Sequence, residues 1–140
     1  MKINLDILIV EDELDLREVF RDMLKMLGCN VIEACNGQEA LAELEKQPFD
    51  VLFTDIQMPE MDGCSLIHSI YNLKLAKAPE IFIMTGRIET DTHLELGADA
   101  VHLVKGFLSK PFSYKQISIL LQECFQNKQS NTNATIAGND

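Results

Sequence analysis

The stretch that decides the fold lies near the N-terminus and reads Leu5-Asp6-Ile7-Leu8-Ile9-Val10-Glu11-Asp12-Glu13. Its aliphatic centre is far shorter than the roughly 20 apolar residues that a membrane-spanning helix needs. A short, continuously apolar run is typical of a strand that is buried on both faces, as in a parallel sheet covered by helices. Acidic residues follow directly, so we expect carboxylates at the carboxyl end of this strand.

Further segments along the chain have a similar strand-like composition, and helical patterns lie between them. The additional predicted strands cover residues 31–35, 51–54, 81–84 and 107–109. Apolar residues recur at helical spacing in residues 16–27, 40–44, 66–70 and 117–125, and Ser113 with Gln116 forms a capping box before the last of these. This alternation predicts an α/β fold with a parallel sheet and right-handed crossovers.

Composition narrows the possible functions. The chain has 140 residues and a net charge of −10, from 12 basic and 22 acidic residues. Phosphate backbones are bound by clustered lysine and arginine, so we expect no direct binding of nucleic acid.

We expect one domain over residues 1–127 and a flexible, polar C-terminal tail over residues 128–140. The N-terminus lacks the apolar core of a signal peptide, which favours a cytoplasmic protein that does not enter a membrane.

Polar side chains follow the predicted strands at their carboxyl ends. Glu11 and Asp12 follow the first strand, Asp55 the third, Thr85 the fourth and Lys110 the fifth. Open parallel sheets bind ligands at this edge, so these side chains are expected to converge there. Clustered carboxylates repel one another, and a hard cation such as Mg²⁺ removes the repulsion. The set predicts a site in which one carboxylate attacks phosphorus while cations offset the charge.

Four motifs, in this order, resemble the receiver domain of two-component response regulators, the CheY-like domains. They are Ile9-Val10-Glu11-Asp12, Asp55-Ile56-Gln57-Met58-Pro59-Glu60-Met61-Asp62-Gly63, Met84-Thr85-Gly86 and Leu108-Ser109-Lys110-Pro111-Phe112. The resemblance extends over residues 4–126. It implies a doubly wound, flavodoxin-like fold, with a five-stranded parallel sheet in the order 2-1-3-4-5 and helices on both faces.

The resemblance also implies a role for each residue of the site. The matching positions are Asp55 as phosphoacceptor, Glu11, Asp12, Asp55 and the backbone carbonyl of Gln57 as ligands of Mg²⁺, Lys110 as the ion-pair partner of the phosphate, Thr85 and Phe107 as switch residues, and Pro111 as the second residue of a cis peptide.

Two of the positions flank the path of the water that attacks the aspartyl phosphate in this family, and here they are Gln57 and Arg87. Gln57 can orient a water, but its side chain is less constrained than that of asparagine. Arg87 has no carboxylate to steer water, and its guanidinium can pair with phosphoryl oxygens. We therefore expect a longer-lived phosphate than in a fast chemotaxis-type receiver.

The segment after Gly97-Ala98-Asp99 departs from the family pattern and allows two alignments. In one alignment the fourth helix ends near Gly97 and an insertion follows. In the other, the helix runs from Thr92 to Lys105 and Gly106 ends it. Apolar residues keep helical spacing throughout this segment, which favours the second alignment. In either case the surface around the fourth helix, where the family binds output partners, is atypical.

The implied function is that of a phosphoacceptor in a two-component phosphorelay. The chain would take a phosphoryl group from a sensor histidine kinase or a phosphotransfer protein and switch conformation to control a partner. Such a protein is not an enzyme, since it catalyses only its own phosphorylation and dephosphorylation. There are three alternatives. An aspartyl phosphatase needs a second aspartate where Gln57 stands, and a flavin-binding module would have its phosphate repelled by the acidic residues. An unphosphorylated scaffold would not need the complete set of polar residues at the strand ends.

Overall fold

The structure is a computed structural model that describes residues 2–56, 61–85, 96–98 and 100–138, with the backbone alone for residues 131–138. Within these residues the sheet consists of β1 (Asp6–Val10), β2 (Asn30–Ala34), β3 (Val51–Asp55), β4 (Glu80–Thr85) and β5 (Val104–Ser109). Neighbouring strands are parallel, in the order β2-β1-β3-β4-β5. The predicted fold class and strand order are therefore confirmed.

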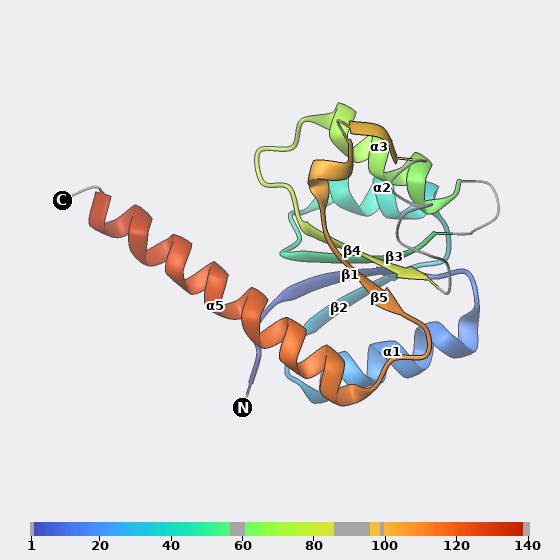
Figure 1. The fold of residues 1–140 in the computed structure, drawn as a ribbon, viewed down its shortest axis with the longest axis horizontal. Helices are drawn as coiled ribbons and strands as arrows, with labels where there is room; N and C mark the ends of the chain where they lie inside the picture. Colours follow the sequence, from blue (N-terminus) through green and yellow to red (C-terminus); the bar gives the residue numbers. More distant parts are fainter. Residues whose placement is uncertain (1, 57–60, 86–95, 99, 139–140) are drawn as a thin grey trace.

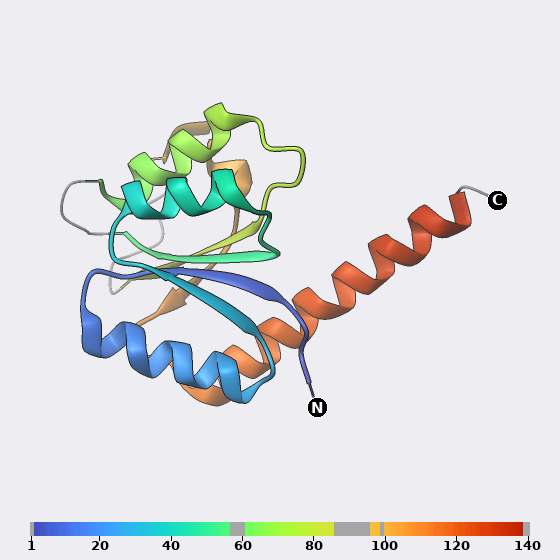
Figure 2. The same cartoon turned by 180° about the vertical axis from the view of Figure 1, so that it is seen from behind.

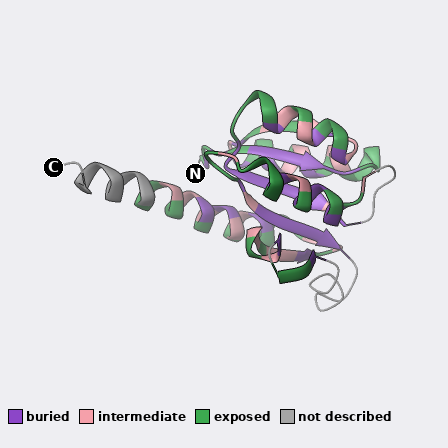
Figure 3. Ribbon diagram, turned by 90° about the horizontal axis from the view of Figure 1, so that it is seen from above, coloured by how far each residue is buried: buried purple, intermediate pink, exposed green. Residues whose placement is uncertain are grey.

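Helices cover both faces of the sheet. Figures 1 and 2 show α1 (Leu14–Met26) and α5 (Tyr114–Gly138) on one face, and α2 (Gly37–Lys46) and α3 (Gly63–Leu73) on the other. Because side chains alternate along a strand, each strand serves two apolar clusters. In β1, Leu8 packs into the cluster under α2 and α3, whereas Ile7 and Ile9 pack under α1 and α5. Figure 3 shows the resulting burial of the strands between the helices.

Local signals fix the ends of the helices. The predicted capping box is present: the Ser113 N–H donates to Gln116 Oε1 at 2.7 Å, and the Gln116 N–H donates to Ser113 Oγ at 3.2 Å. Before α2, the side chain of Asn36 accepts a hydrogen bond from the Glu39 N–H at 2.8 Å. After α1, Gly28 has a φ of 91°, a left-handed conformation that suits glycine. Because these signals begin or end the helices at defined residues, the connections between the helices and the neighbouring strands are short.

The chain before β5 differs from the favoured alignment. Val101–Leu103 form a 3₁₀ turn (η1) and residues 104–109 form β5, so the predicted helix from Thr92 to Lys105 is wrong over this part; residues 92–95 lie outside the described ranges. Residues 96–98 and residue 100 are helical, and Gly97 has a φ of 77°, so neither alignment describes this segment fully. Helical spacing of apolar residues is a local signal, and pairing with β4 outweighs it by satisfying the backbone of this segment.

The extra length of β5 is taken up by an irregularity in its pairing with β4. Ile81 pairs with Val104, but the next residue, Phe82, pairs with Gly106, so the ladder passes over Lys105. Such a bulge places two residues of one strand against one residue of the other. Beyond the bulge, the pairing of the two strands is regular as far as Thr85 and Ser109. This regular pairing fixes the position of Lys110, the residue that follows β5.

The last helix also differs from the prediction. A flexible tail was expected from residue 128, whereas α5 continues to Gly138 and its end extends away from the sheet (Figure 1). Lys128 Nζ donates to the buried carboxylate of Asp50 at 3.1 Å, which ties α5 to the amino edge of the sheet. A helix satisfies its own backbone hydrogen bonds, so it can continue without an apolar face. The domain boundary near residue 127 stays a prediction. None of the described helices is long and apolar enough to cross a membrane.

Candidate functional site

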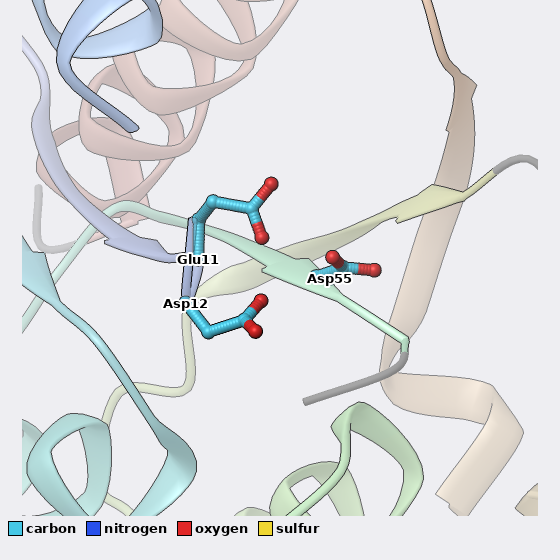
Figure 4. A group of neighbouring side chains, drawn as sticks. All are labelled: Glu11, Asp12 and Asp55. Atoms are coloured by element: carbon cyan, nitrogen blue, oxygen red, sulfur yellow. The ribbon is translucent and has the colours of Figure 1, made fainter. Parts of the chain in front are cut away.

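Three carboxylates gather where β1 and β3 end. The two strands are neighbours, with Val10 opposite Thr54, so Glu11 and Asp12 leave the sheet beside Asp55. One oxygen from each carboxylate lies within 4.8 Å of the others (Figure 4). Glu11 is buried, Asp12 is exposed and Asp55 is half-buried. The convergence predicted for these residues is therefore present in the structure.

The carboxylate of Glu11 is in an unfavourable electrostatic environment. Burial and the neighbouring Asp55 raise the pKa of Glu11 to about 7, although Lys110 acts in the opposite direction. One of its oxygens, Oε2, is buried and has no hydrogen-bond partner among the described residues. A buried acceptor without a partner is costly, and a bound cation would supply the missing interaction.

Lys110 joins the carboxylates from the other side of the sheet edge. It follows β5, and its Nζ donates to Glu11 Oε1 and to Asp55 Oδ2, each at 3.0 Å. Burial alone would lower the pKa of Lys110, but the two carboxylates raise it, so the side chain is charged. The backbone N–H of Lys110 donates to the carbonyl of Thr85 at 3.1 Å. The peptide bond between Lys110 and Pro111 is cis, as the resemblance implied.

The donor set fits a hard divalent cation. Mg²⁺ prefers oxygen ligands, and here three carboxylates offer oxygens at close range, one of them a buried atom with an unmet acceptor. Lys110 alone leaves the cluster with more negative than positive charge. Glu11, Asp12 and Asp55 are thus the described residues that could hold the ion. Gln57, whose carbonyl was predicted as a further ligand, lies outside the described residues.

The two predicted switch residues lie on neighbouring strands. Thr85 is the last residue of β4 and is buried at the same edge as Asp55. Phe107 is half-buried in β5, opposite Ile83, and packs against the cluster under α2 and α3. The structure therefore puts both residues within the sheet that carries the site, while their roles stay predictions. Arg87 lies outside the described residues.

Two contributions to the site were not found from the sequence. Gly63, at the start of α3, passes so close to the backbone of Asp55 that a side chain there would collide with the Asp55 carbonyl oxygen. Arg17, in the first half of α1, donates from Nη1 to the carbonyl oxygen of Glu11 at 2.8 Å. An arginine one to two turns into a helix that follows a polar strand end is the signal that could have found the second contact.

A comparison with protein families gives a match to the family described as the response regulator receiver domain, over residues 7–122. Among curated proteins, the chain is 32% identical over 126 residues to the probable transcriptional regulator ycf27 of Cyanidium caldarium, covering 89% of this chain and 47% of that protein. It is 30% identical over 128 residues to the transcriptional regulatory protein ZraR of Escherichia coli, covering 91% of this chain and 28% of that protein. The chain thus spans less than half the length of these two relatives.

Solved structures with the same fold include two isolated receiver domains. A CheY-like receiver domain from Methylobacillus flagellatus matches with a TM-score of 0.73 and 27% identity, covering 85% of this chain and 97% of that one. The receiver domain of sensor histidine kinase PA1611 from Pseudomonas aeruginosa, which has a magnesium ion coordinated in its active-site cleft, matches with a TM-score of 0.76 and 25% identity, covering 88% of this chain and 98% of that one.

Proposed function

Because the chain belongs to the family of response-regulator receiver domains, we propose that it accepts a phosphoryl group on Asp55, with Mg²⁺, from a sensor histidine kinase or a phosphotransfer protein. The observation that carries this proposal is the bridge from Lys110 to both Glu11 and Asp55 within one carboxylate cluster. Phosphorylation then switches the conformation of the domain and controls a partner. The chain acts as a signalling switch and not as an enzyme on external substrates.

The residues of the site divide the work of the transfer. A carboxylate oxygen of Asp55 attacks phosphorus, and the bond between phosphorus and the donor nitrogen breaks as the new P–O bond forms. Lys110, which is charged and 3.0 Å from Asp55, would pair with an oxygen of the transferring group. Glu11 and Asp12 would hold Mg²⁺, which supplies positive charge that offsets the charge of the phosphoryl group. Because Glu11 is buried, water screens its interactions with Lys110 and with a cation less than it would at the surface.

The switch would operate through β4 and β5. Thr85 stands at the end of β4, next in the sheet to the strand that ends at Asp55, so its hydroxyl is suited to donate to a phosphoryl oxygen. A movement of Thr85 would change the space available to Phe107, which is half-buried one strand away. A half-buried aromatic ring can adopt inner and outer positions of similar free energy, which is the property that a two-state element needs.

The apolar surface beside the site suits the protein that donates the phosphoryl group. A cavity of about 310 Å³ lies next to Lys110 and is lined mainly by apolar side chains, among them Phe20, Met84 and Phe112. Leu16 and Val19 of α1 also line it and are 44% and 55% exposed. A histidine-bearing helix that docks on this surface would bring its ring toward Asp55 while burying apolar area.

The remaining predictions are part of the same proposal. Gln57 contributes a backbone carbonyl to the cation, and Gln57 and Arg87 set the lifetime of the phosphate. The receiver domain covers residues 1–127 of a cytoplasmic protein that does not itself bind nucleic acid, a proposal supported by its net charge of −10.

The proposal is tested by phosphorylation with a small phosphodonor such as acetyl phosphate. In the presence of Mg²⁺, intact-mass analysis should show one added phosphoryl group on the wild type and none on Asp55→Asn, because the amide is close to isosteric but is not a nucleophile. Asp62→Asn is a matched control: Asp62 caps α3 through the Ser65 N–H, and asparagine can cap equally well. Equal labelling of Asp55→Asn and the wild type would place the phosphoacceptor elsewhere.

A further inference from the structure

Glu11 is the residue at which the chain leaves the sheet after β1. Its N–H still donates to the carbonyl of Ala34, the last residue of β2, at 3.1 Å. Its carbonyl oxygen accepts instead from a side chain, Nη1 of Arg17, at 2.8 Å. Both backbone groups of Glu11 are therefore fixed, one by the sheet and the other by α1.

The guanidinium of Arg17 is itself held in place. Its Nε donates to Glu33 Oε1 of β2 at 3.2 Å, and Glu33 Oε2 accepts from Nη1 of Arg21 at 3.3 Å. The side chains of Arg17 and Glu33 are 15% and 29% exposed, so this ion pair is partly shielded from water. A guanidinium has several donors in one rigid plane, so a bond at Nε fixes the direction of the bond at Nη1.

We propose that Arg17 is a positioning residue of the cation site, which holds the backbone of Glu11 so that the carboxylates of Glu11 and Asp12 face Asp55 before the cation binds. The three carboxylates repel one another, yet they present oxygens within 4.8 Å, so the backbone that carries them must be held. Rotation about the bonds between Glu11 and Asp12 would turn the second carboxylate away. Two nitrogens of Arg17 already have partners, which makes this role more natural than direct binding of phosphate.

This inference rests on the proposed function, because it assumes that the carboxylate cluster binds Mg²⁺. Groups that orient metal ligands without touching the metal typically change its affinity by about 10- to 100-fold. Arg17→Met keeps the apolar part of the side chain and removes the donors. We expect this variant to raise the Kd for Mg²⁺ about tenfold, the low end of that range, since the ligands themselves remain.

Arg21→Met is the matched control. Arg21 lies one turn further along α1 and also pairs with Glu33, but its hydrogen bonds go to Asp22 and Glu33 and not to the Glu11 carbonyl. It should change the Kd for Mg²⁺ less than twofold. Arg17→Lys should recover part of the affinity, because an ammonium can donate to the carbonyl but cannot hold Glu33 in the same geometry.

Calorimetric titration with MgCl₂ measures the Kd, since the chain has no tryptophan to report binding by fluorescence. Thermal unfolding without Mg²⁺ measures the purely structural effect of each variant. A Kd raised in Arg17→Met and not in Arg21→Met supports the inference, as does a full phosphorylation rate of Arg17→Met at saturating Mg²⁺. An unchanged Kd in Arg17→Met, or equal changes in both variants, overturns it.

The two proposals fail in different ways. A wild type that shows neither Mg²⁺ binding nor labelling of Asp55 contradicts the proposed function. A wild type that binds Mg²⁺ and is labelled, together with an Arg17→Lys and an Arg17→Met variant of wild-type Mg²⁺ affinity, contradicts only the role of Arg17. If Arg17→Met does not fold, Arg17→Lys and Glu33→Gln decide the matter, and a wild-type Kd in both overturns the inference.

Discussion

Asp50→Ala should destabilise the fold from the edge of the sheet opposite to the site. Asp50 precedes β3, and its side chain is 6% exposed. Oδ2 accepts from the N–H of Asp6 at 2.8 Å and from Nζ of Lys128 at 3.1 Å, while Oδ1 accepts from Nζ of Lys77 at 2.8 Å. One carboxylate therefore joins the start of β1, the segment before β4 and the later part of α5.

The size of the effect follows from how well each donor can reach water. The N–H of Asp6 would lose a charged acceptor, and a hydrogen bond to a charged group contributes about 1.5–3 kcal/mol. The side chains of Lys77 and Lys128 are 56% and 38% exposed, so both can be solvated after the change. Each of these ion pairs adds only about 0.2–1 kcal/mol. We expect Asp50→Ala to lower the free energy of unfolding by about 2–4 kcal/mol at neutral pH.

The pH dependence of this effect has a definite sign. Burial alone would raise the pKa of Asp50, but the hydrogen bonds from Asp6, Lys77 and Lys128 together lower it below the ordinary value of 3.8. A group whose pKa is lowered by folding contributes its full stability above the unfolded pKa and loses it as the pH falls through the folded pKa. The difference between wild type and Asp50→Ala should therefore be constant near pH 7 and shrink below pH 3.8.

Urea unfolding followed by far-ultraviolet circular dichroism, over a series of pH values, measures this difference. Asp22→Ala is the control, because it removes a carboxylate that is 65% exposed and pairs with Arg21 on the surface. It should have little effect on stability at any pH. Equal losses of stability in the two variants at pH 7, or a loss in Asp50→Ala that does not shrink in acid, would contradict this role of Asp50.

Two further predictions concern the site. Gly63→Ala should destabilise the protein by about 1–3 kcal/mol and slow labelling by the phosphodonor, because a Cβ would collide with the carbonyl of Asp55, the proposed phosphoacceptor, and displace it. Unchanged melting and labelling would show that the backbone can yield. Arg87→Ala should accelerate loss of phosphate after the donor is removed, since alanine cannot pair with the phosphoryl oxygens. An unchanged rate would mean that Arg87 does not shield the phosphate.

Much of the fold could be predicted because the signals were local and agreed with one another. The strand that ends at Val10 is continuously apolar and is followed by acidic residues, so the sequence alone indicates both its burial and its place in the site. The convergence of Asp55 and Lys110 on Glu11 followed from the rule that ligands bind at the carboxyl edge of a parallel sheet. The strand order itself came from the resemblance, not from the pattern.

The errors arose where a distant contact decides the outcome. Val104 and Lys105 continue a helical spacing of apolar residues, yet they belong to β5 because β4 supplies hydrogen-bond partners that no local pattern reveals. On α1, Leu16 and Val19 belong to the apolar stripe but are exposed, and they line the cavity beside Lys110. The Arg17 contact depends on a side-chain conformation, which composition and spacing do not determine.

The bulge at Lys105 determines where this domain can gain or lose a residue and still keep the position of Lys110. Register in a sheet has a period of two, so a chain that gained or lost one residue within a regular strand would turn every later side chain to the opposite face. Here the ladder passes over Lys105 and is regular from Gly106 to Ser109, next to Lys110. The bulge thus accommodates one extra residue without displacing Lys110, whereas a residue inserted between Gly106 and Ser109 would turn Lys110 away from both carboxylates.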